Sequence, residues 1–163
     1  MEISLGGRGG SPSRRRINKN ITKKENITML KVLPIQSKSE QEIICKRCGV
    51  EYRPELLAYS ADYDGTLAGV CQFKLTGDGG ILYDIAAASD FTGDTFEPLF
   101  VMGRGTLNFI DLCGIHRAYF DGEISDEGLI RAIGFTKNES GRFEVNLEGF
   151  FDEPCKHHPM KKM

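Results

Sequence analysis

One stretch of the sequence combines residue types that could bind a phosphate-bearing ligand. It runs from Gly80 to Gly114, passing from an apolar strand with one acid, Asp84, through a short polar loop into a long apolar helix. Unpaired backbone N–H groups and the positive end of the helix dipole point into such a gap. The polar loop is therefore the first place to look for a binding site, and Asp84 is a candidate for proton transfer.

The elements before this stretch alternate between strand and helix. A β-like run over Leu30–Ile35 is followed by a predicted helix over Ser39–Cys48, with Ser39 as N-cap, Glu42 at the capping-box position and Gly49 as the stop. Two further runs, Ala58–Tyr63 and Thr66–Leu75, flank Asp64-Gly65. This dipeptide is the strongest short signal for a hairpin, so the two strands are predicted to be antiparallel neighbours.

The second half continues the alternation. We predict a strand over Ile81–Ala87 and a helix over Phe96–Cys113, where apolar residues recur at helical spacing before Gly114. His116–Glu123 alternates as a strand, Ser125 is the expected cap of a short helix that ends at Ile133, and Arg142–Leu147 is predicted to close the sheet. The prediction is an α/β (α+β) single domain, with a mixed, mostly antiparallel sheet flanked by helices.

This order resembles the GNAT superfamily of acyl-CoA-dependent N-acyltransferases over Met29 to Phe151. Three local matches carry the resemblance: the Asp64-Gly65 hairpin followed by Leu67-Ala68-Gly69-Val70, the run Tyr83-Asp84-Ile85-Ala86-Ala87, and Ala132-Ile133-Gly134-Phe135 at a helix end. The second match is similar to the family's central strand, whose bulge frees backbone amides for a thioester carbonyl. The resemblance therefore implies that Ile85 and Ala87 contact the thioester of acetyl-CoA or another acyl-CoA.

The same resemblance places a pyrophosphate loop at Thr92, Gly93, Asp94 and Thr95. Family members with activity have glycines and arginines there, whereas this loop keeps only Gly93 and is followed by Glu97. Carboxylates beside a pyrophosphate cost on the order of 1 kcal/mol or more at an effective dielectric of about 20. We therefore expect weak cofactor binding unless the backbone compensates.

A second departure concerns the general acid. Many family members have a tyrosine four residues before the glycine of the Gly-Phe pair, and Ile130 occupies that position here. The remaining candidates for proton transfer are Asp84, Glu123, Tyr119 and Tyr83. Asp84 is the predicted catalytic residue, because partial burial would raise its pKa toward neutrality and allow it to deprotonate an ammonium group. The alternative is that Asp84 is a solvated acid on the open face of the sheet.

The cysteines allow a different kind of site. Cys45 and Cys48 have the spacing of a zinc half-site, and Cys155 with His157 could complete a structural tetrahedron. A helix also buries cysteines as small hydrophobes, and we prefer that interpretation. No metal is therefore expected. Five cysteines, an odd number scattered through core-like sequence, are unlike a disulfide scaffold and favour a cytoplasmic location.

Charge divides the chain into a leader and a body. Residues 1–28 hold seven basic and two acidic side chains, a net charge of +5, so with −2 overall the remainder carries −7. The leader lacks apolar periodicity and is predicted to be disordered and dispensable for folding, with residues 29–163 as the domain. No apolar run is long enough to span a membrane, and nucleic acid is not the expected partner.

Three functional hypotheses follow. The first is an acyl-CoA-dependent N-acyltransferase that transfers an acetyl or other acyl group to a small-molecule or peptide amine. The second is a GNAT-fold binding or regulatory module without catalysis, which the acidic loop and the missing tyrosine favour. The third is a small interaction protein whose fold is stabilised by a structural zinc ion. The sequence does not indicate an oligomeric state.

Overall fold

The structure is a computed structural model that describes residues 28–152. The predictions for the basic leader and for Cys155 and His157 lie outside these residues. The described chain forms three helices and seven strands: β1 (Leu30–Pro34), α2 (Lys38–Arg47), β2 (Leu57–Tyr63), β3 (Thr66–Thr76), β4 (Gly79–Ala87), α3 (Phe96–Leu112), β5 (Arg117–Phe120), α4 (Glu127–Ile133), β6 (Thr136–Lys137) and β7 (Phe143–Asn146). No helix in this part of the chain is long and apolar enough to cross a membrane.

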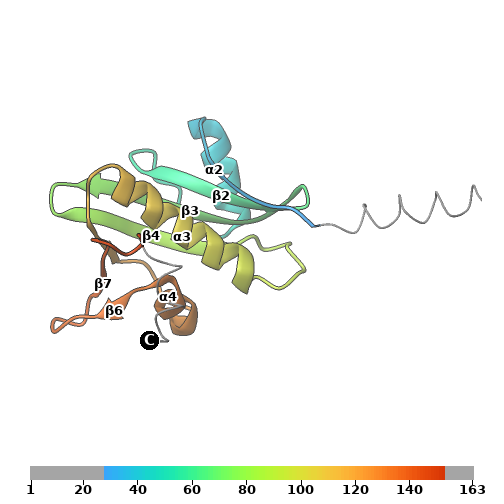
Figure 1. Cartoon of the computed structure of the whole chain (residues 1–163). Helices are drawn as coiled ribbons and strands as arrows, with labels where there is room; N and C mark the ends of the chain where they lie inside the picture. The colour runs from blue at the N-terminus through green and yellow to red at the C-terminus, as the bar shows by residue number, and fades with distance from the viewer. Residues whose placement is uncertain (1–27, 153–163) are drawn as a thin grey trace, which may run out of the picture.

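All seven strands belong to one sheet, in the order β1-β2-β3-β4-β5-β7-β6. The neighbours are antiparallel except for β4 and β5, which run parallel. Figure 1 shows α3 lying across β3 and β4, with α4, β6 and β7 on the far side of β4. The prediction of a mixed, mostly antiparallel sheet with Ile81–Ala87 at its centre is confirmed.

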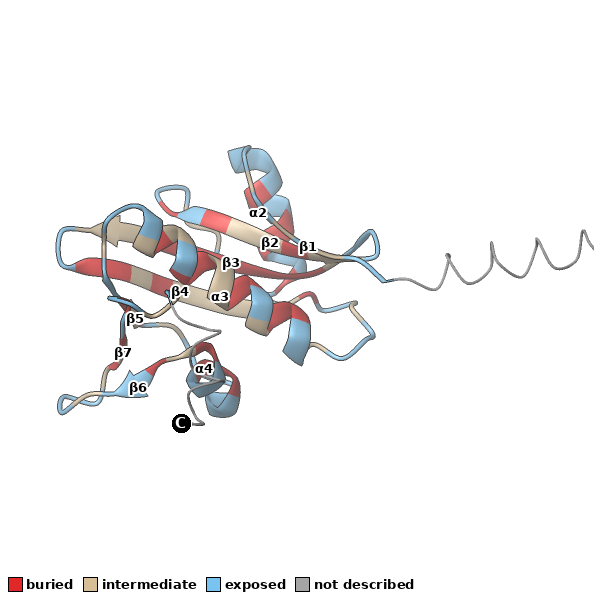
Figure 2. Ribbon diagram, viewed as in Figure 1, coloured by how far each residue is buried: buried red, intermediate tan, exposed pale blue. Residues whose placement is uncertain are grey.

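Alternation along β3 shows which helix covers which face. Cys71 and Phe73 belong to the main core beneath α3, whereas Val70 belongs to a smaller cluster with Ile44 and Cys45 of α2. Because successive side chains of a strand point to opposite faces, α2 and α3 lie on opposite sides of the sheet. Figure 2 shows the buried residues following the sheet and the inner stripe of α3.

The hairpin prediction is confirmed in detail. β2 and β3 are antiparallel, and Tyr63 pairs with Thr66 across the turn. Asp64 and Gly65 have φ values of +55° and +85°. A two-residue hairpin turn with positive φ at both positions matches the twist of the strands, and glycine and aspartate are among the residues that tolerate it.

Both predicted helix caps were wrong by one or two positions. Ser37, rather than Ser39, caps α2, because its backbone is extended and its hydroxyl accepts a hydrogen bond from Glu40 N at 3.2 Å. Ser39 lies within the helix. Asp126, rather than Ser125, caps α4 by accepting a hydrogen bond from Leu129 N at 3.1 Å. In each case several capping residues stand close together, and only the backbone conformation selects one of them.

The end of the sheet also differs from the prediction. β5 stops at Phe120, three residues before the predicted end of the strand at Glu123. β7 lies between β5 and β6 and is not the edge strand. The edge strand is β6, whose two residues are too few to show a period in the sequence.

Candidate active site

The sheet opens between its two parallel strands. β4 and β5 pair only from Gly80 to Leu82 of β4, and Asp121 N donates the last hydrogen bond across the pair, to Leu82 O at 2.9 Å. β4 continues for five more residues, to Ala87, while the chain after β5 turns away. The side of β4 that faces β5 is therefore left without a strand partner beyond Leu82.

A bulge at Tyr83 accompanies this opening. Gln72 of β3 pairs with Asp84 and Phe73 pairs with Leu82, so Tyr83 is the extra residue. Ala88 N donates to Ala68 O of β3 at 2.9 Å. Because backbone groups alternate along a strand, those of Asp84 and Ala86 also face β3, and those of Ile85 and Ala87 face the opening. These are the two residues predicted to contact a thioester.

Gly122 allows the two strands to approach before they part. A Cβ atom built on it would lie 2.1 Å from Tyr83 O and 2.8 Å from Tyr83 C. Both of these are backbone atoms, so no rotamer change could relieve the overlap. In the sequence, only the Asp121-Gly122 dipeptide marks this position.

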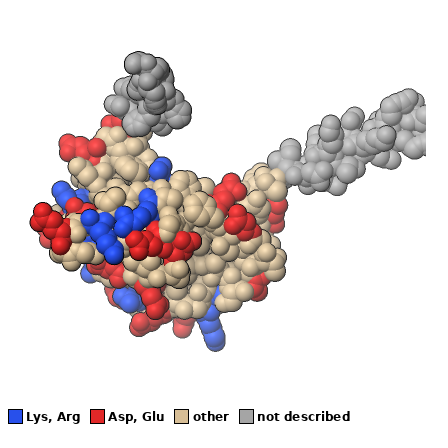
Figure 3. All heavy atoms as spheres, turned by 90° about the horizontal axis from the view of Figure 1, so that it is seen from below, with Lys and Arg blue, Asp and Glu red and all other residues tan. Residues whose placement is uncertain are grey.

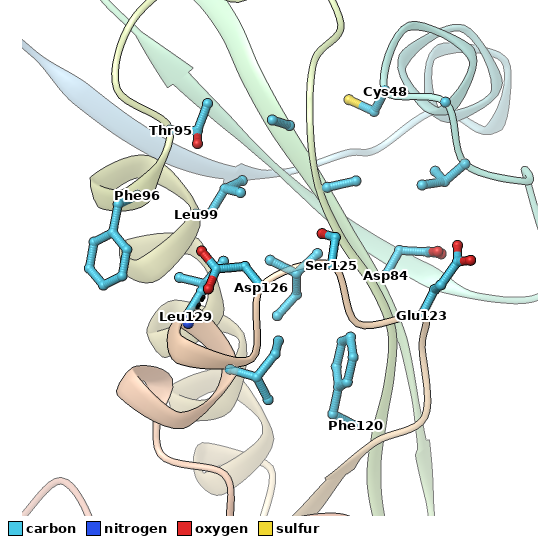
Figure 4. Close-up of a pocket in the computed structure, with 16 residues that line it drawn as sticks. Cys48, Asp84, Thr95, Phe96, Leu99, Phe120, Glu123, Ser125, Asp126 and Leu129 are labelled. Carbon is cyan, nitrogen blue, oxygen red and sulfur yellow. Dashed lines mark hydrogen bonds between the residues drawn. The ribbon is translucent and has the colours of Figure 1, made fainter.

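A cavity of about 320 Å³ occupies the opening. Its walls come from the end of α2, the second half of β4, the start of α3, the segment after β5 and the start of α4 (Figure 4). The cavity therefore reaches from the α2 face of the sheet to the α3 face. Of the predicted site residues, Asp84, Ile85, Ala87 and Thr95 line it, and Thr92, Gly93 and Asp94 do not.

Asp84 stands on the α2 face of this cavity. Its Oδ2 accepts a hydrogen bond from Gln72 Nε2 at 2.7 Å. Burial raises the pKa of the Asp84 carboxyl above its usual range, against the lowering effects of the Gln72 hydrogen bond and the Arg53 charge, and Glu51 raises it further. A half-buried carboxylate with a raised pKa is suited to accept a proton near neutral pH.

Two polar side chains from the segment after β5 share the cavity with Asp84. Figure 4 shows Glu123 on the same side of the cavity as Asp84, and Ser125 directed into the cavity. Ile130 lines the cavity where the resemblance leads us to expect a tyrosine. The sequence pattern indicates Ser125 only as a helix cap, whereas in the structure it lines the cavity.

Tyr83 and Tyr119 lie on the open part of the α2 face, beside cations. Arg53 and Lys74 lie 5.1 Å and 5.9 Å from the centroid of the Tyr83 ring, and Arg142 stacks 3.8 Å from that of Tyr119. Neither tyrosine lines the cavity between β4 and β5. As proton donors they are therefore less well placed than Glu123 or Ser125.

The predicted phosphate loop borders a second cavity, of about 420 Å³. Thr92, Gly93 and Asp94 line it together with Asp90 and Glu97. Among the described residues, the backbone N–H groups of Thr92, Gly93, Asp94 and Thr95 have no hydrogen-bond acceptor. The backbone therefore offers donors to an anion, whereas three carboxylates oppose it. Arg47 is the nearby cation, and it pairs with Asp90 at 3.4 Å.

The N-terminus of α3 has few donors left for a phosphate. Phe96 N donates to Asp94 Oδ1 at 3.1 Å, and Leu99 N donates to Thr95 O at 3.2 Å. Pro98 has no N–H, so Glu97 supplies the one remaining donor of this first turn.

In Figure 3 acidic side chains gather on the right of the view, the side that holds the β4–α3 loop in Figure 1, and no lysine or arginine is visible among them.

Comparison with known proteins places this architecture. No protein-family model matches the sequence, and the search of curated proteins gave no match. Three solved structures are similar to the chain. They are the PaiA N-acetyltransferase of Thermoplasma acidophilum in complex with coenzyme A (TM-score 0.55, 12% identity, 72% of this chain and 99% of that one), a GNAT family acetyltransferase of Brucella melitensis in complex with acetyl-CoA (0.55, 13%, 74% and 89%) and a variant of the spermidine N-acetyltransferase SpeG of Vibrio cholerae (0.57, 10%, 76% and 96%).

The chain has the GNAT fold. The resemblance inferred from the Asp-Gly hairpin, the Asp-Ile-Ala strand and the Gly-Phe helix end is thus confirmed for the fold. At 10–13% identity the likeness concerns the path of the backbone, and the roles of individual residues stay predictions.

In this GNAT fold Cys45 and Cys48 pack in the cluster beneath α2. Burial raises the pKa of the Cys45 thiol to about 11 and that of Cys48 to about 12, which opposes the thiolate form that zinc requires. Within residues 28–152 no group of three or more His, Cys, Asp or Glu side chains is placed to hold a metal ion. The predicted partners Cys155 and His157 lie outside the described residues.

Proposed function

We propose that this protein is an acyl-CoA-dependent N-acyltransferase whose active site is the opening between β4 and β5. The observation that carries the proposal is the cavity of about 320 Å³ that crosses the sheet at this opening. It brings backbone groups of Ile85 and Ala87 and the carboxylate of Asp84 to one place. The neighbours solved with coenzyme A or acetyl-CoA have the same fold and support this assignment.

The chemistry begins with proton transfer. Asp84 takes a proton from the ammonium form of the acceptor, and the free amine nitrogen attacks the thioester carbonyl carbon. Negative charge then develops on the thioester oxygen, where backbone N–H groups of Ile85 and Ala87 can donate hydrogen bonds. The C–N bond forms, the C–S bond breaks and the thiolate departs. The attacking nitrogen loses its second proton as the amide forms, and Glu123 or Ser125, which line the cavity, can pass that proton to the departing thiolate.

The chain suits the acyl and pantetheine part of an acyl-CoA better than it suits the pyrophosphate. Apolar side chains of Leu99, Leu129 and Ile130 line the cavity and suit a thioester and its pantetheine arm. At the loop, the free N–H groups of Thr92–Thr95 suit the pyrophosphate, and the carboxylates of Asp94 and Glu97 do not. We therefore expect binding that depends on the acyl and pantetheine part and is weakened at the phosphates.

The acceptor approaches from the face opposite α3, where Asp84 lies. Arg53 acts on the charge of Asp84, and both Arg53 and Lys74 lie over the ring of Tyr83, the residue before Asp84. In the described part of the chain, Lys74 has no ion-pair partner, and Arg53 has a long contact of 3.8 Å with Glu51. These cations favour an acceptor that carries a carboxylate as well as an amine.

Calorimetric titration with acetyl-CoA tests the proposal directly. The variant D94N/E97Q should bind more tightly than the wild type, because it removes two charges and still leaves an oxygen to accept from Phe96 N. The same double substitution to glycine would also remove the hydrogen bond that Phe96 N donates to Asp94 Oδ1 at the start of α3, so a change in affinity would not report on charge alone. E139Q/E148Q is the matched control, since it removes two charges from exposed positions outside the loop.

Transfer to amines, followed by release of free thiol, completes the test. D84N should slow transfer and leave the dissociation constant for acetyl-CoA unchanged, because Asp84 faces the acceptor. Absence of binding at millimolar acetyl-CoA in both the wild type and D94N/E97Q would contradict the proposal.

A non-catalytic module with the GNAT fold is the second candidate. It is favoured by the acidic phosphate loop and by Ile130 in place of a tyrosine. This candidate predicts that D94N/E97Q gains no affinity for acetyl-CoA and that no amine is acylated. Binding of acetyl-CoA without transfer to any amine, in both the wild type and D84N, would also favour it.

A further inference from the structure

Gln72 is a fully buried polar side chain in the middle of the sheet, and all of its hydrogen-bonding capacity is used. Its Nε2 donates to Asp84 Oδ2 at 2.7 Å and to Glu51 O at 2.8 Å. Its Oε1 accepts from Gln41 Nε2 at 2.9 Å and from Arg53 N at 3.2 Å. An amide has two N–H donors and an oxygen that accepts two hydrogen bonds, so this side chain is saturated.

The chain of hydrogen bonds continues into α2. Gln41 is also buried, and its Oε1 accepts from Lys38 Nζ at 3.0 Å. Lys38 Nζ donates in addition to Leu56 O at 2.6 Å, which holds the ammonium in place. The path therefore runs from Lys38 through Gln41 and Gln72 to Asp84.

The two ends of this path fix its direction. An ammonium can only donate and a carboxylate can only accept, so each amide between them must present its oxygen toward Lys38 and its nitrogen toward Asp84. Reversal of either amide would place two donors or two acceptors face to face. Such a chain polarises in one sense and strengthens the hydrogen bond at its end.

Other charged and titratable groups face Asp84 from the surrounding elements. Glu51 and Arg53, on the segment between α2 and β2, act on the Asp84 carboxyl, and the Asp84 charge in turn helps to raise the pKa values of Cys45 on α2 and Cys71 on β3. Glu123 shares the cavity from the segment after β5. Gln72 is the uncharged group that contacts Asp84 directly. Asp84 Oδ1 accepts no hydrogen bond from the described residues.

We propose that Gln72 is the positioning residue of this site, and that Lys38, Gln41 and Gln72 hold Asp84 ionised with Oδ1 free for the acceptor amine. This inference rests on the proposed function. It makes the basicity of Asp84 depend on the docking of α2 against the sheet, because the chain of hydrogen bonds begins on that helix. The docking of α2 thereby contributes to the protonation state of the base.

NMR titration of the Asp84 carboxyl, in protein with ¹³C-labelled aspartate and with D84N to assign the signal, tests the inference without any acyl transfer. Q72M keeps the length of the side chain and removes its donor, so the pKa of Asp84 should rise by about one unit. Q41M should raise it by less, since Gln72 keeps its bond to Asp84 and loses only its orienting partner. E42Q, on the exposed side of α2, is the control and should leave the pKa unchanged.

The transfer assay supplies a second readout. In Q41M the acidic limb of the pH profile of kcat/KM should move to higher pH by the shift that NMR measures, while the affinity for acetyl-CoA stays constant. A pKa of Asp84 that is unchanged in both Q72M and Q41M would overturn the inference and leave the proposed function standing. If Q72M does not fold, Q41M alone decides. Absence of acyl transfer by the wild type would overturn the proposed function. The NMR titration would then still decide whether the hydrogen-bond chain controls the pKa of the Asp84 carboxyl.

Discussion

Replacing Gly122 by alanine should distort the opening between β4 and β5. The new Cβ would lie 2.1 Å from Tyr83 O, and real Cβ atoms do not approach other atoms within 3.0 Å, so the two backbones must separate by about 0.9 Å. The contact lies where Asp121 N still donates to Leu82 O, at the last hydrogen bond of the pair. The substitution therefore acts at the point where β4 and β5 part, and not at Ile85 or Ala87, the residues proposed to contact the acyl group.

The cost follows from the atoms involved. Overpacking of a filled site costs about 1–3 kcal/mol. Both partners here are backbone atoms that cannot rotate away, so we expect the upper end of that range. For a domain of this size 1 kcal/mol shifts Tm by roughly 3–5 °C, so the G122A variant should melt about 10 °C below the wild type.

Differential scanning calorimetry of G122A beside G77A measures this effect. Gly77 lies in the turn between β3 and β4, it has no positive φ, and an added Cβ would meet no atom within 4 Å. G77A should therefore melt with the wild type, and G122A should also bind acetyl-CoA more weakly. A melting temperature of G122A within about 2 °C of that of G77A would show that β4 and the segment after β5 are not in close contact at Gly122.

Three further predictions concern other parts of the molecule. S37A should destabilise the protein by about 1 kcal/mol in urea unfolding, while S39A should cost less, because Ser37 is the residue that caps α2; equal effects would contradict the assignment. A thiol reagent followed by mass spectrometry should label Cys113 of the native protein and spare Cys45, Cys48 and Cys71, which are buried, with pKa values raised to between about 11 and about 12; rapid labelling of any of these three would show that its helix or strand opens. Burial raises the pKa of Asp84 in the folded protein above its pKa in the unfolded chain. The stability that Asp84 contributes is therefore complete below the unfolded-state pKa and is lost as the pH rises through the folded-state pKa. The free energy of unfolding of D84N minus that of the wild type should therefore increase from pH 4 to pH 7, and a constant difference would argue against the raised pKa.

Local patterns predicted much of the fold. Asp64-Gly65 predicted the hairpin because few dipeptides adopt positive φ at both positions, and Gly114, with φ of +86°, ended α3 as expected. The cap of α2 was misplaced because Ser37 and Ser39 are equivalent in the sequence. β6 was missed because its two residues carry no period.

The candidate site was predictable only in part. Asp84, Ile85 and Ala87, which line the cavity, were predicted as site residues because they lie on one strand with a recognisable pattern. Gln72 and Gly122 were not found, because their importance arises from contacts with residues 12 and 39 positions away, Asp84 and Tyr83 respectively. Such contacts leave no local pattern.

The sequence by itself determined the order of the elements other than β6, the acidic character of the loop before α3 and the absence of a tyrosine at Ile130, since each depends on residue type and neighbours along the chain. The tertiary structure alone decided that β4 and β5 part after Leu82, that the Asp94 carboxylate accepts a hydrogen bond from Phe96 N, and that Lys38, Gln41 and Gln72 lead to Asp84. The physical reason is that hydrogen bonds and steric contacts between distant segments depend on register and packing. A shift of one residue in the register of β3 would turn Gln72 to the opposite face of the sheet and break the path to Asp84.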